Sequence, residues 1–450
     1  MIELLIGTLV TLAVGRYIFK GYSATGVLLS GGLLLLAITA LMGKAVLPAS
    51  VPSTGHMATD IFEYVRFLLV DRGGGLGMLI MVLCGFAGYM SHIGANTILV
   101  KLASKPLGVI KSPYILLVAA YLVACAMSLA VSSATGLGVL LMATLFPLMV
   151  NMGISRGAAA AVCASPAAII LSPTSGDVVM AAQAANMELI EFAFKLTLPI
   201  SLVAIAAMAV THFFWQRYLD QKAGEHNAAV APSDLVTDAP GFYAILPFTP
   251  IIGVLLFDGK LGPKLDIVTI IVICLVLAAL LELVRKRNGR ELLDGLQVCW
   301  RNMADAFAGV VMLLVGAGVF AHRLMGLGFT ATLLDPAQSF RTGGIVPMLV
   351  LVVITTLAAF TTGSGNAPFY AFVELIPHLA TSLGVNPAYL VIPMLQASNL
   401  GRTISPVSGV VVACAGMGNL SPFEVVKRTS LPVAVGLLVV ILATQIMVPA

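Results

Sequence analysis

Residues 398–409 read Ser-Asn-Leu-Gly-Arg-Thr-Ile-Ser-Pro-Val-Ser-Gly and lie between two apolar runs. The stretch places Arg402 and Pro406 where a plain membrane-spanning helix carries Leu and Val. Backbone that leaves the helix at membrane depth is stable only where protein or a water-filled cavity satisfies its polar groups. An arginine at that depth is costly and typically functional. The stretch therefore predicts a broken helix that forms part of a substrate site in a transporter.

The composition of the chain supports this membrane context. Of its 450 residues, 59% are apolar and only 10% are charged, whereas a soluble domain carries about 25% charged residues. Apolar runs long enough to cross a bilayer core recur from end to end,. The sequence therefore predicts an all-α, multi-pass membrane protein whose net charge of +4 gives no indication of a nucleic-acid partner.

Several functional classes lack any motif in the sequence. No phosphate-binding loop of the ATPase type is present, and no histidines are paired at metal-ligand spacing,. The six cysteines lie in or at the ends of apolar runs and form no metal-like pair, so we expect buried thiols. We expect no cofactor, no metal site and no enzyme activity.

An internal repeat organises the chain. Sliding residues 172–200 onto 405–433 without a gap gives 11 identities in 29 positions, including a shared Ser-Pro-x-Ser-Gly. Small polar tips at 132–138 and 361–366 each lie between two apolar arms, which is typical of a re-entrant hairpin. We predict two inverted repeats, each with about five transmembrane helices, one re-entrant hairpin and one broken helix. Such repeats indicate a secondary transporter.

The predicted boundaries follow the repeat. The halves are residues 1–218 and 241–450, joined by a polar linker at 219–240, and plain spans are expected at 241–257 and 265–284. The scaffold is expected from about 1–95 and 241–328, and the transport domain from about 113–190 and 345–418.

The basic run at 285–290 sets the predicted orientation. By the positive-inside rule these residues face the cytoplasm,. Propagating that assignment places the linker 219–240 in the cytoplasm and both termini in the periplasm, with most of the 24 lysines and arginines inside.

Two charged residues mark the breaks asymmetrically. Arg402 corresponds to Ile169 in the other repeat, and Asp177 corresponds to Val410. A guanidinium binds a carboxylate with two charge-assisted hydrogen bonds, so Arg402 is the main substrate-binding candidate; the alternatives are a structural ion pair and a snorkelling side chain. Asp177 is a proton-coupling candidate, or else a helix-capping carboxylate or a partner for Arg402. Glu374 is a second proton-coupling candidate. The alternative is that its side chain faces water near the rim.

The remaining candidates are hydroxyls, amides and glycines at the tips and breaks. Glycine lets backbone approach a ligand closely, while small residues also pack helices tightly in membranes. The predicted substrate-binding set, in addition to Arg402, is Ser132, Ser133, Thr135, Gly136, Thr174, Ser175, Thr361, Thr362, Gly363, Ser364, Gly365, Asn366, Ser398, Asn399, Thr403, Ser405 and Ser408. His92 and His322 flank helix ends and are weaker candidates for handling protons.

Five segments resemble one known family. They are the stretches at 21–27, 130–147, 172–177, 361–374 and 396–412, among them Ala-Val-Ser-Ser-Ala-Thr-Gly-Leu-Gly and Thr-Thr-Gly-Ser-Gly-Asn-Ala-Pro-Phe-Tyr. These closely resemble the DcuC family of anaerobic C4-dicarboxylate transporters of bacteria, and the resemblance covers nearly the whole chain. It implies an inner-membrane carrier of succinate, fumarate and malate that favours succinate efflux with protons in anaerobic metabolism.

The resemblance also implies membership of the broader ion-transporter superfamily. Its sodium-coupled divalent-anion carriers are similar in having two hairpins and two broken helices, and they work as homodimers by an elevator mechanism. Those carriers have Ser-Asn-Thr at both tips, which this chain lacks; its nearest matches are at 398–400 and 95–97. Proton coupling through Asp177 or Glu374 is therefore favoured over sodium.

Three functions remain to be weighed. The first is a secondary active, elevator-type carrier of C4-dicarboxylates, with a small diacid, protons and the lipid bilayer as partners. The second is a sodium-coupled carrier of another organic or inorganic divalent anion. The third is a channel, which would lack paired breaks, or a membrane-embedded enzyme, which would need a nucleophile and base that the sequence does not show.

Overall fold

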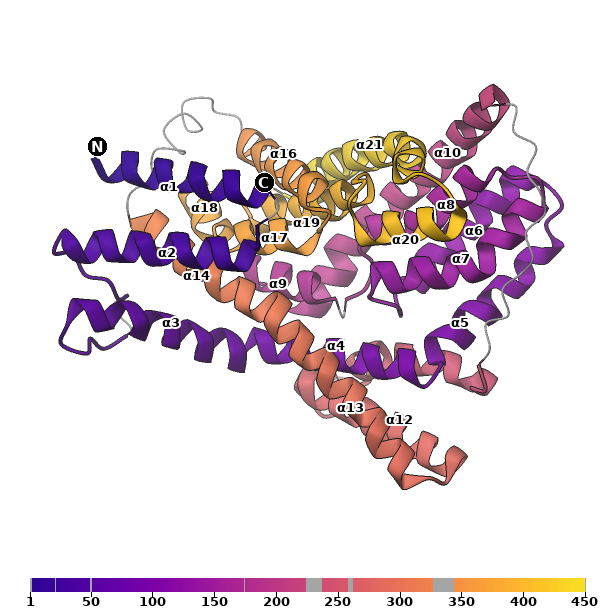
Figure 1. Ribbon diagram of the computed structural model, residues 1–450, viewed down its shortest axis with the longest axis horizontal. Helices are drawn as coiled ribbons and strands as arrows, with labels where there is room; N and C mark the ends of the chain where they lie inside the picture. The colour runs from indigo at the N-terminus through magenta and orange to yellow at the C-terminus, as the bar shows by residue number, and fades with distance from the viewer. Residues whose placement is uncertain are drawn as a thin grey trace.

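The computed structural model describes residues 2–20, 22–48, 51–173, 175–223, 237–257, 262–326 and 344–449. Every regular element in these ranges is a helix (Figure 1), which confirms the predicted all-α class. Seven helices are long and apolar enough to cross a membrane, or eight if one bent pair is counted as a span. The chain is a multi-pass membrane protein.

The first half of the chain forms these helices: α1 Ile2–Phe19, α2 Ala24–Leu41, α3 Met57–Gly74, α4 Leu76–His92, α5 Ala95–Ser104, α6 Pro113–Met127, α7 Ala134–Asn151, α8 Arg156–Ala164, α9 Gly176–Ala184 and α10 Leu198–Ala223. The second half forms α11 Thr249–Leu256, α12 Ile267–Lys286, α13 Gly289–Ala306, α14 Met312–Gly326, α16 Ile345–Thr362, α17 Asn366–Val373, α18 Ile376–Leu383, α19 Pro387–Thr403, α20 Gly409–Gly418 and α21 Pro422–Met447.

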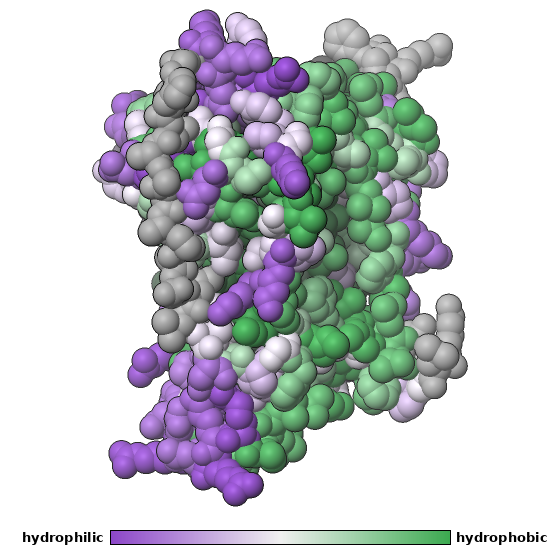
Figure 2. All heavy atoms as spheres, turned by 90° about the vertical axis from the view of Figure 1, so that its right-hand side faces the viewer, coloured by the Kyte–Doolittle hydropathy of each residue, from purple (hydrophilic) through white to green (hydrophobic). Residues whose placement is uncertain are grey.

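The outer surface is that of a protein embedded in lipid. Large apolar side chains on the long helices point outward, including Leu280, Val353 and Leu438, each more than half exposed. In Figure 2, hydrophobic side chains cover much of the surface between hydrophilic groups that gather toward the top and bottom of the view. A soluble protein rarely exposes contiguous apolar area on this scale.

The helices pack in two groups. In one, α10 packs on α21, α16 on α19, and α7 on α8 and α20. In the other, α2 packs on α14 and α4 packs on α13, and α3 and α4 form one bent pair with an angle of 46° between them. The first group contains both predicted hairpins and both predicted breaks, and the second contains most of the predicted scaffold.

The first of the two breaks begins earlier in the chain than the sequence predicts. The first was predicted at 172–177, but α8 already ends at Ala164, and a short 3-10 turn at Pro166–Ala168 precedes extended backbone. Proline lacks the N–H that would continue the helix, so Pro166 moves the break upstream. The second break separates α19, which ends at Thr403, from α20, which begins at Gly409.

Past the breaks, the two repeats share backbone detail at the offset of 233 residues. Helices α9 and α20 begin at Gly176 and Gly409, after N-cap residues Ser175 and Ser408 with ψ of 138° and 136°. Asn186 and Asn419 both adopt left-handed backbone, with φ of 53° and 52°. Left-handed backbone is rare for residues other than glycine. These matches support an internal duplication, and its inversion stays a prediction.

Two other boundaries differ from the prediction. Helix α10 runs to Ala223, into the predicted linker, because Asp220 is fixed by an ion pair with Arg428. Most of the linker lies outside the described residues. The plain span expected at 241–257 is a 3-10 helix at Gly241–Phe248 followed by the short α11. Pro247 and Pro250 remove two backbone donors there.

Candidate functional site

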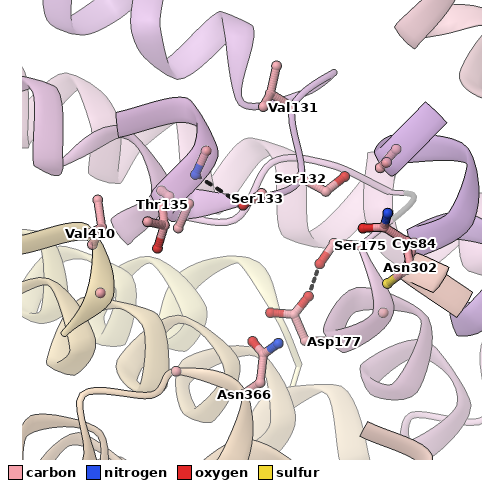
Figure 3. Close-up of a pocket in the computed structure, with 18 of the residues that line it drawn as sticks. Cys84, Val131, Ser132, Ser133, Thr135, Ser175, Asp177, Asn302, Asn366 and Val410 are labelled. Carbon is pink, nitrogen blue, oxygen red and sulfur yellow. Dashed lines mark hydrogen bonds between the residues drawn. The ribbon is translucent and has the colours of Figure 1, made fainter. Parts of the chain in front are cut away.

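A cavity of about 1030 Å³ lies where the two groups of helices meet. One wall is built from the tip before α7, the break before α9, the tip before α17 and the break around α19 and α20. The opposite wall comes from α4, the start of α5, and α13. Figure 3 shows Asp177 between Ser175 and Asn366, with Thr135 and Asn302 on either side.

Four helices begin at this cavity. The first residues of α7, α9, α17 and α20 all line it, from Ala134, Gly176, Asn366 and Gly409 onward. A helix N-terminus presents unpaired backbone N–H groups and behaves as roughly half a positive charge. Four such termini offset roughly two negative charges, so the cavity is suited to a dianion.

Serines precede two of these termini, and one of them keeps its hydroxyl group available. Ser175 and Ser408 are the N-cap residues of α9 and α20, and neither makes a side-chain cap hydrogen bond. The Ser408 hydroxyl is buried and has no hydrogen-bond partner among the described residues. Ser133 is different, because its hydroxyl accepts a hydrogen bond from the Gly136 N–H of α7. The free Ser408 hydroxyl can donate to a bound ligand.

Arg402 lies at the C-terminal end of α19 and reaches across the repeat boundary. Its Nη2 donates to the carbonyl of Ala167, 2.9 Å away in the other break. Its Nε is buried without a partner, and no ion pair involves Arg402 in the ranges that the structure describes. The structural ion pair considered as an alternative is therefore not found. A guanidinium with free donors facing a cavity can bind a carboxylate.

Asp177 is buried in the first turn of α9 and faces the same cavity. Its carboxylate accepts hydrogen bonds from the Ser175 hydroxyl, from the Val178 N–H at 3.2 Å and from Asn399 Nδ2 at 3.2 Å. Asp177 forms no ion pair with Arg402 in the described part of the chain. The two opposite charges thus share one cavity without neutralising each other directly.

Glycines at the second tip allow the hairpin to touch the second break. Gly363 has φ of +69°, and a Cβ there would lie 2.8 Å from the carbonyl oxygen of Val407. A Cβ on Gly365 would lie 2.6 Å from Asn399 Oδ1 and 3.3 Å from Arg402 Nη1. Only glycine fits both positions without displacing these groups. The tip therefore holds the side of the cavity that carries Arg402.

The structure brings most of the predicted site residues together. Those that line the cavity are Ser132, Ser133, Thr135, Gly136, Ser175, Gly363, Ser364, Gly365, Asn366, Asn399, Arg402 and Ser408. Those that do not line it are Thr361, Thr362, Ser398, Thr403 and Ser405. Thr174 lies outside the described residues. Among the excluded residues, the hydroxyls of Thr361, Ser398 and Thr403 bond back to carbonyls of their own helix, which satisfies them locally.

Glu374 lies away from the cavity. It follows α17 directly and forms an ion pair with Arg72 at 2.9 Å, with the Glu374 side chain 14% exposed. Arg72 lies in the last turn of α3, next to its bend with α4. The pair joins the second hairpin to the other group of helices. Local sequence patterns do not predict this contact, because the two residues are 302 positions apart.

One glutamine supports the first break from the second repeat. Gln396 of α19 accepts a hydrogen bond from the Ile170 N–H at 2.9 Å and donates to the Ile170 carbonyl at 3.2 Å. It also donates to the Ser201 hydroxyl at 3.1 Å. Extended backbone at membrane depth must be satisfied by protein, and Gln396 does this for residues just before α9. Its counterpart in the first repeat is Cys163, so the sequence repeat gave no signal for it.

The wall opposite the breaks was not in the predicted site. Ser91 and His92 end α4, Asn96 begins α5, and Asn302 lies on α13; all four line the cavity. Asn96 donates to the Ser91 hydroxyl at 2.7 Å, and its own Oδ1 is buried without a partner. The signal that marks this wall in the sequence is a group of polar residues at the end of the apolar run 75–95.

Comparisons with known proteins extend over the whole chain. A family model for DcuC, a C4-dicarboxylate anaerobic carrier, matches residues 2–449. The anaerobic C4-dicarboxylate transporter DcuC of Escherichia coli strain K12 is 69% identical over 448 residues, which cover 100% of this chain and 97% of that protein. The probable anaerobic C4-dicarboxylate transporter DcuC of Vibrio cholerae is 61% identical over 452 residues, covering 100% and 98%. These relatives confirm the prediction of a transporter rather than an enzyme.

Two solved membrane transporters share the fold. The YdaH transporter of Alcanivorax borkumensis has a TM-score of 0.64 at 18% identity, covering 94% of this chain and 97% of that one. MtrF of Neisseria gonorrhoeae has a TM-score of 0.58 at 13% identity, covering 96% and 97%. At these identities the likeness concerns the fold alone. The family match and the close relatives go further: the chain belongs to the DcuC family of C4-dicarboxylate anaerobic carriers.

Proposed function

We propose that this chain binds succinate, fumarate and malate in the cavity between the two groups of helices and moves them across the bacterial inner membrane with protons. In this proposal the main flux is succinate efflux in anaerobic metabolism. The supporting relatives are C4-dicarboxylate transporters. The substrates, the coupling ion and the mechanism are our inference.

One observation carries the proposal: Arg402 and four helix N-termini line a single cavity. A C4-dicarboxylate has two negative charges and needs two anchors. The guanidinium supplies one, through charge-assisted hydrogen bonds. The first turns of α9 and α20, with the free Ser408 hydroxyl, supply the other through backbone N–H groups,.

Proton coupling follows from the position of Asp177. An ionised Asp177 repels a dianion in the same cavity, because like charges at close range destabilise each other. A protonated Asp177 removes that repulsion and turns one oxygen from an acceptor into a donor. Substrate binding therefore favours proton uptake at Asp177, and loss of the proton favours release. This linkage makes Asp177, rather than the distant Glu374, the proposed coupling residue.

A sodium-coupled carrier of another divalent anion is the second candidate. The observation that favours it is that two residues of the cavity have buried oxygens without partners among the described residues, Asn399 Oδ1 and Ser408 Oγ. Oxygen ligands of this kind suit a hard cation. The proton mechanism is preferred because a carboxylate, Asp177, already faces the site.

The proposed movement is of the elevator type, in a homodimer. The cavity is bounded on one side by the hairpins and breaks and on the other by α4 and α13. Alternating access in transporters with repeats usually involves rigid-body movement of one bundle against another. Movement of the α7, α9, α17 and α20 group along α4 and α13 would carry the substrate with its main ligands.

The test is counterflow in proteoliposomes that contain the purified protein. Vesicles are loaded with unlabelled C3 to C5 acids, and labelled succinate is measured with and without imposed pH and sodium gradients. We expect accumulation with succinate, fumarate and malate inside, and stimulation by a pH gradient. Stimulation by sodium alone would support the second candidate, and leakage without counterflow would support a channel.

A further inference from the structure

A second cavity of about 480 Å³ adjoins the first. It is lined by the end of α4, the start of α5, the end of α12, the start of α13 and residues 237–238. Ser91, His92 and Thr97 line both cavities. These three residues therefore form the boundary between the candidate substrate site and the second cavity, called the neck below.

The second cavity lies beside the basic run at 285–290. Arg285 and Lys286 line it, and Arg285 is paired with Glu282 at 2.5 Å and with Asp238 at 2.9 Å. The hydrogen bond from Arg285 lowers the pKa of Asp238, so this carboxylate stays ionised. Both cations are thus paired with carboxylates, Lys286 with Glu291, while Asp294 also lines the cavity, so its walls are polar.

His92 is the exposed group at the neck. Its ring lies next to α13, where a Cβ on Gly295 would be 3.0 Å from His92 Nε2. The absence of a side chain at Gly295 leaves room for the ring. Neither ring nitrogen of His92 has a hydrogen bond or ion pair within the ranges the structure describes. Either tautomer of a neutral imidazole has one N–H to donate.

Asn96, on the first-cavity side of the neck, provides a second, independent observation. It is only 3% exposed and lines the first cavity, and its Oδ1 has no partner. A buried amide oxygen without a partner destabilises the protein, and a bound hydrated or protonated ligand would remove that cost. The neck therefore offers a free donor in His92 and a free acceptor in Asn96, next to a cavity suited to dianions.

We propose that the second cavity is the path by which the dicarboxylate passes between the site and the membrane side that carries residues 285–290. His92 binds one substrate carboxylate at the neck of this path. The assignment rests on the proposed function for the identity of the ligand, but the path itself follows from the shared walls of the two cavities. It adds His92 to the substrate-contacting residues.

The path is tested by thiol labelling in proteoliposomes. His92→Cys and Asn288→Cys are made separately, since Asn288 lines only the second cavity. Val109→Cys is the control, because Val109 is 80% exposed and lines neither cavity. The unmodified protein gives the background, since its Cys84 lines the first cavity. A membrane-impermeant methanethiosulfonate reagent is added to one side at a time.

We expect the His92 and Asn288 variants to be labelled from the same side. At a succinate concentration ten times its Kd, labelling of His92→Cys should slow about tenfold by occupancy, while labelling of Val109→Cys should not change. Labelling of the His92 variant from the side opposite to that of Asn288 would overturn the path. Equal labelling rates with and without succinate, in protein that transports succinate, would overturn the role of His92.

A second set of variants tests the hydrogen bond. His92→Leu should raise KM for succinate by more than about tenfold, as expected for the loss of one hydrogen bond to a charged group, and His92→Gln should restore most of it. A change in kcat alone, equal in both variants, would indicate a structural role and contradict the proposal. If the unmodified protein shows no succinate counterflow, the proposed function fails, while the sidedness of labelling still tests the path.

Discussion

Residues 172–200 and 405–433 are two copies of one segment, and they differ most in where they carry charge. Both contain Ser-Pro-x-Ser-Gly before a helix that begins at the glycine, and both end that helix near an asparagine with left-handed backbone. The first copy carries Asp177 in the cavity, where the second carries Val410. Arg402, just before the second copy, corresponds to Ile169. The backbone is duplicated, and the two charged residues that line the cavity are not.

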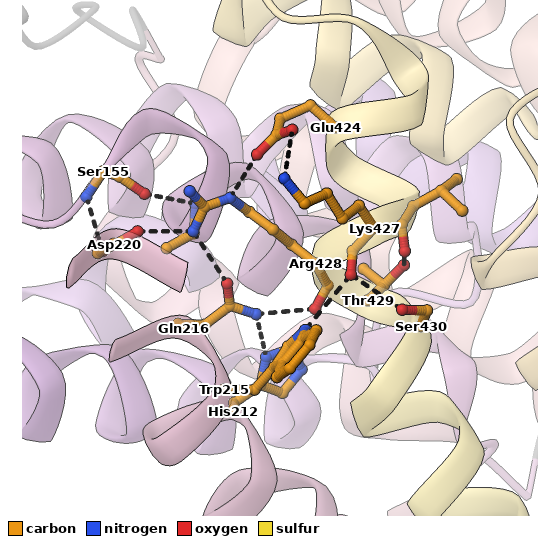
Figure 4. Close-up of polar contacts among 12 residues, drawn as sticks. Ser155, His212, Trp215, Gln216, Asp220, Glu424, Lys427, Arg428, Thr429 and Ser430 are labelled. Carbon is orange, nitrogen blue, oxygen red and sulfur yellow. Dashed lines mark hydrogen bonds and ion pairs between the residues drawn. The ribbon is translucent and has the colours of Figure 1, made fainter. Parts of the chain in front are cut away.

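The two copies also differ after helices α9 and α20, in how far an equivalent ion pair is buried. Glu191 and Lys195 form an ion pair at 2.7 Å, and the equivalent residues Glu424 and Arg428 form one at 2.9 Å. The Lys195 side chain is 71% exposed, whereas that of Arg428 is 2% exposed. Figure 4 shows that Arg428 also reaches Asp220 and Gln216 of α10. The same sequence pattern is a surface pair in one repeat and the centre of a buried network in the other.

This difference shows that the repeated sequence sets the backbone of the site, whereas substitutions at single positions make its two ends chemically different. The shared serines, prolines and glycines fix where helices stop and start. A symmetric site would give a dianion equal surroundings at both ends. The unequal placement of Arg402 and Asp177 gives the cavity one cationic anchor and one titratable group.

The largest expected effect comes from removing Arg402, the cation that has no counterpart in the first repeat. Arg402→Ala should reduce succinate transport about thirtyfold or more, since truncating one partner of a buried charge pair costs about 2–5 kcal/mol. Arg402→Lys should recover only part of the activity, because an ammonium lacks the planar fork. Labelled succinate uptake measures both, and thermal unfolding in detergent checks that the protein is folded. Transport by the alanine variant at near the normal rate would refute the substrate role.

The two equivalent ion pairs give a matched test of stability. Arg428→Ala leaves the nearly buried Asp220 without its cation, whereas Glu424 keeps Lys427, so the free energy of unfolding should fall by about 3–5 kcal/mol. Lys195→Ala removes an exposed pair and should change it by about 0–1 kcal/mol. Thermal or denaturant unfolding of the two variants in the same detergent provides the comparison. Equal losses would mean that burial does not distinguish the two copies.

The sequence predicted the frame of the site better than its walls. Breaks, tips and Arg402 were found because polar and glycine residues interrupt apolar runs, and at membrane depth such interruptions need a reason. Of the opposite wall only His92 was a candidate, for handling protons; Ser91 and Asn302 were missed, since polar residues are ordinary at or near helix ends. The start of the first break was misplaced because Pro166 lies in an alanine-rich run whose composition remains helical.

Long-range pairing was also beyond the sequence. Glu374 was a proton candidate on its position in the hairpin, and the structure pairs it with Arg72 from the bend between α3 and α4. Gln396 replaces a cysteine in the repeat and satisfies broken backbone in the other half. Both roles depend on tertiary contacts between residues more than 200 positions apart, which local patterns do not encode.

Removing the carboxyl group of Asp177, which the second copy lacks, should affect proton coupling more than substrate binding. Asp177→Asn keeps the size and a donor but cannot take up a proton. One proton per cycle across a difference of one pH unit corresponds to about tenfold accumulation, and we expect the asparagine variant to lose this stimulation while counterflow persists. Asp177→Glu, which keeps a carboxyl, should retain a response to pH. A full response in the asparagine variant would make Asp177 structural.

The smallest effect concerns what the two copies share. Asn186 and Asn419 hold φ of 53° and 52°, a conformation that costs other L-residues roughly 1–2 kcal/mol and glycine almost nothing. Asn186→Ala and Asn419→Ala should therefore each lower the free energy of unfolding by about 1 kcal/mol, and the glycine variants should stay within about 0.5 kcal/mol of the original. Thermal unfolding of the four variants measures this. If the free energies of unfolding of the two alanine variants differ by as much as those of the Lys195→Ala and Arg428→Ala variants, the backbones of the two copies are not equivalent.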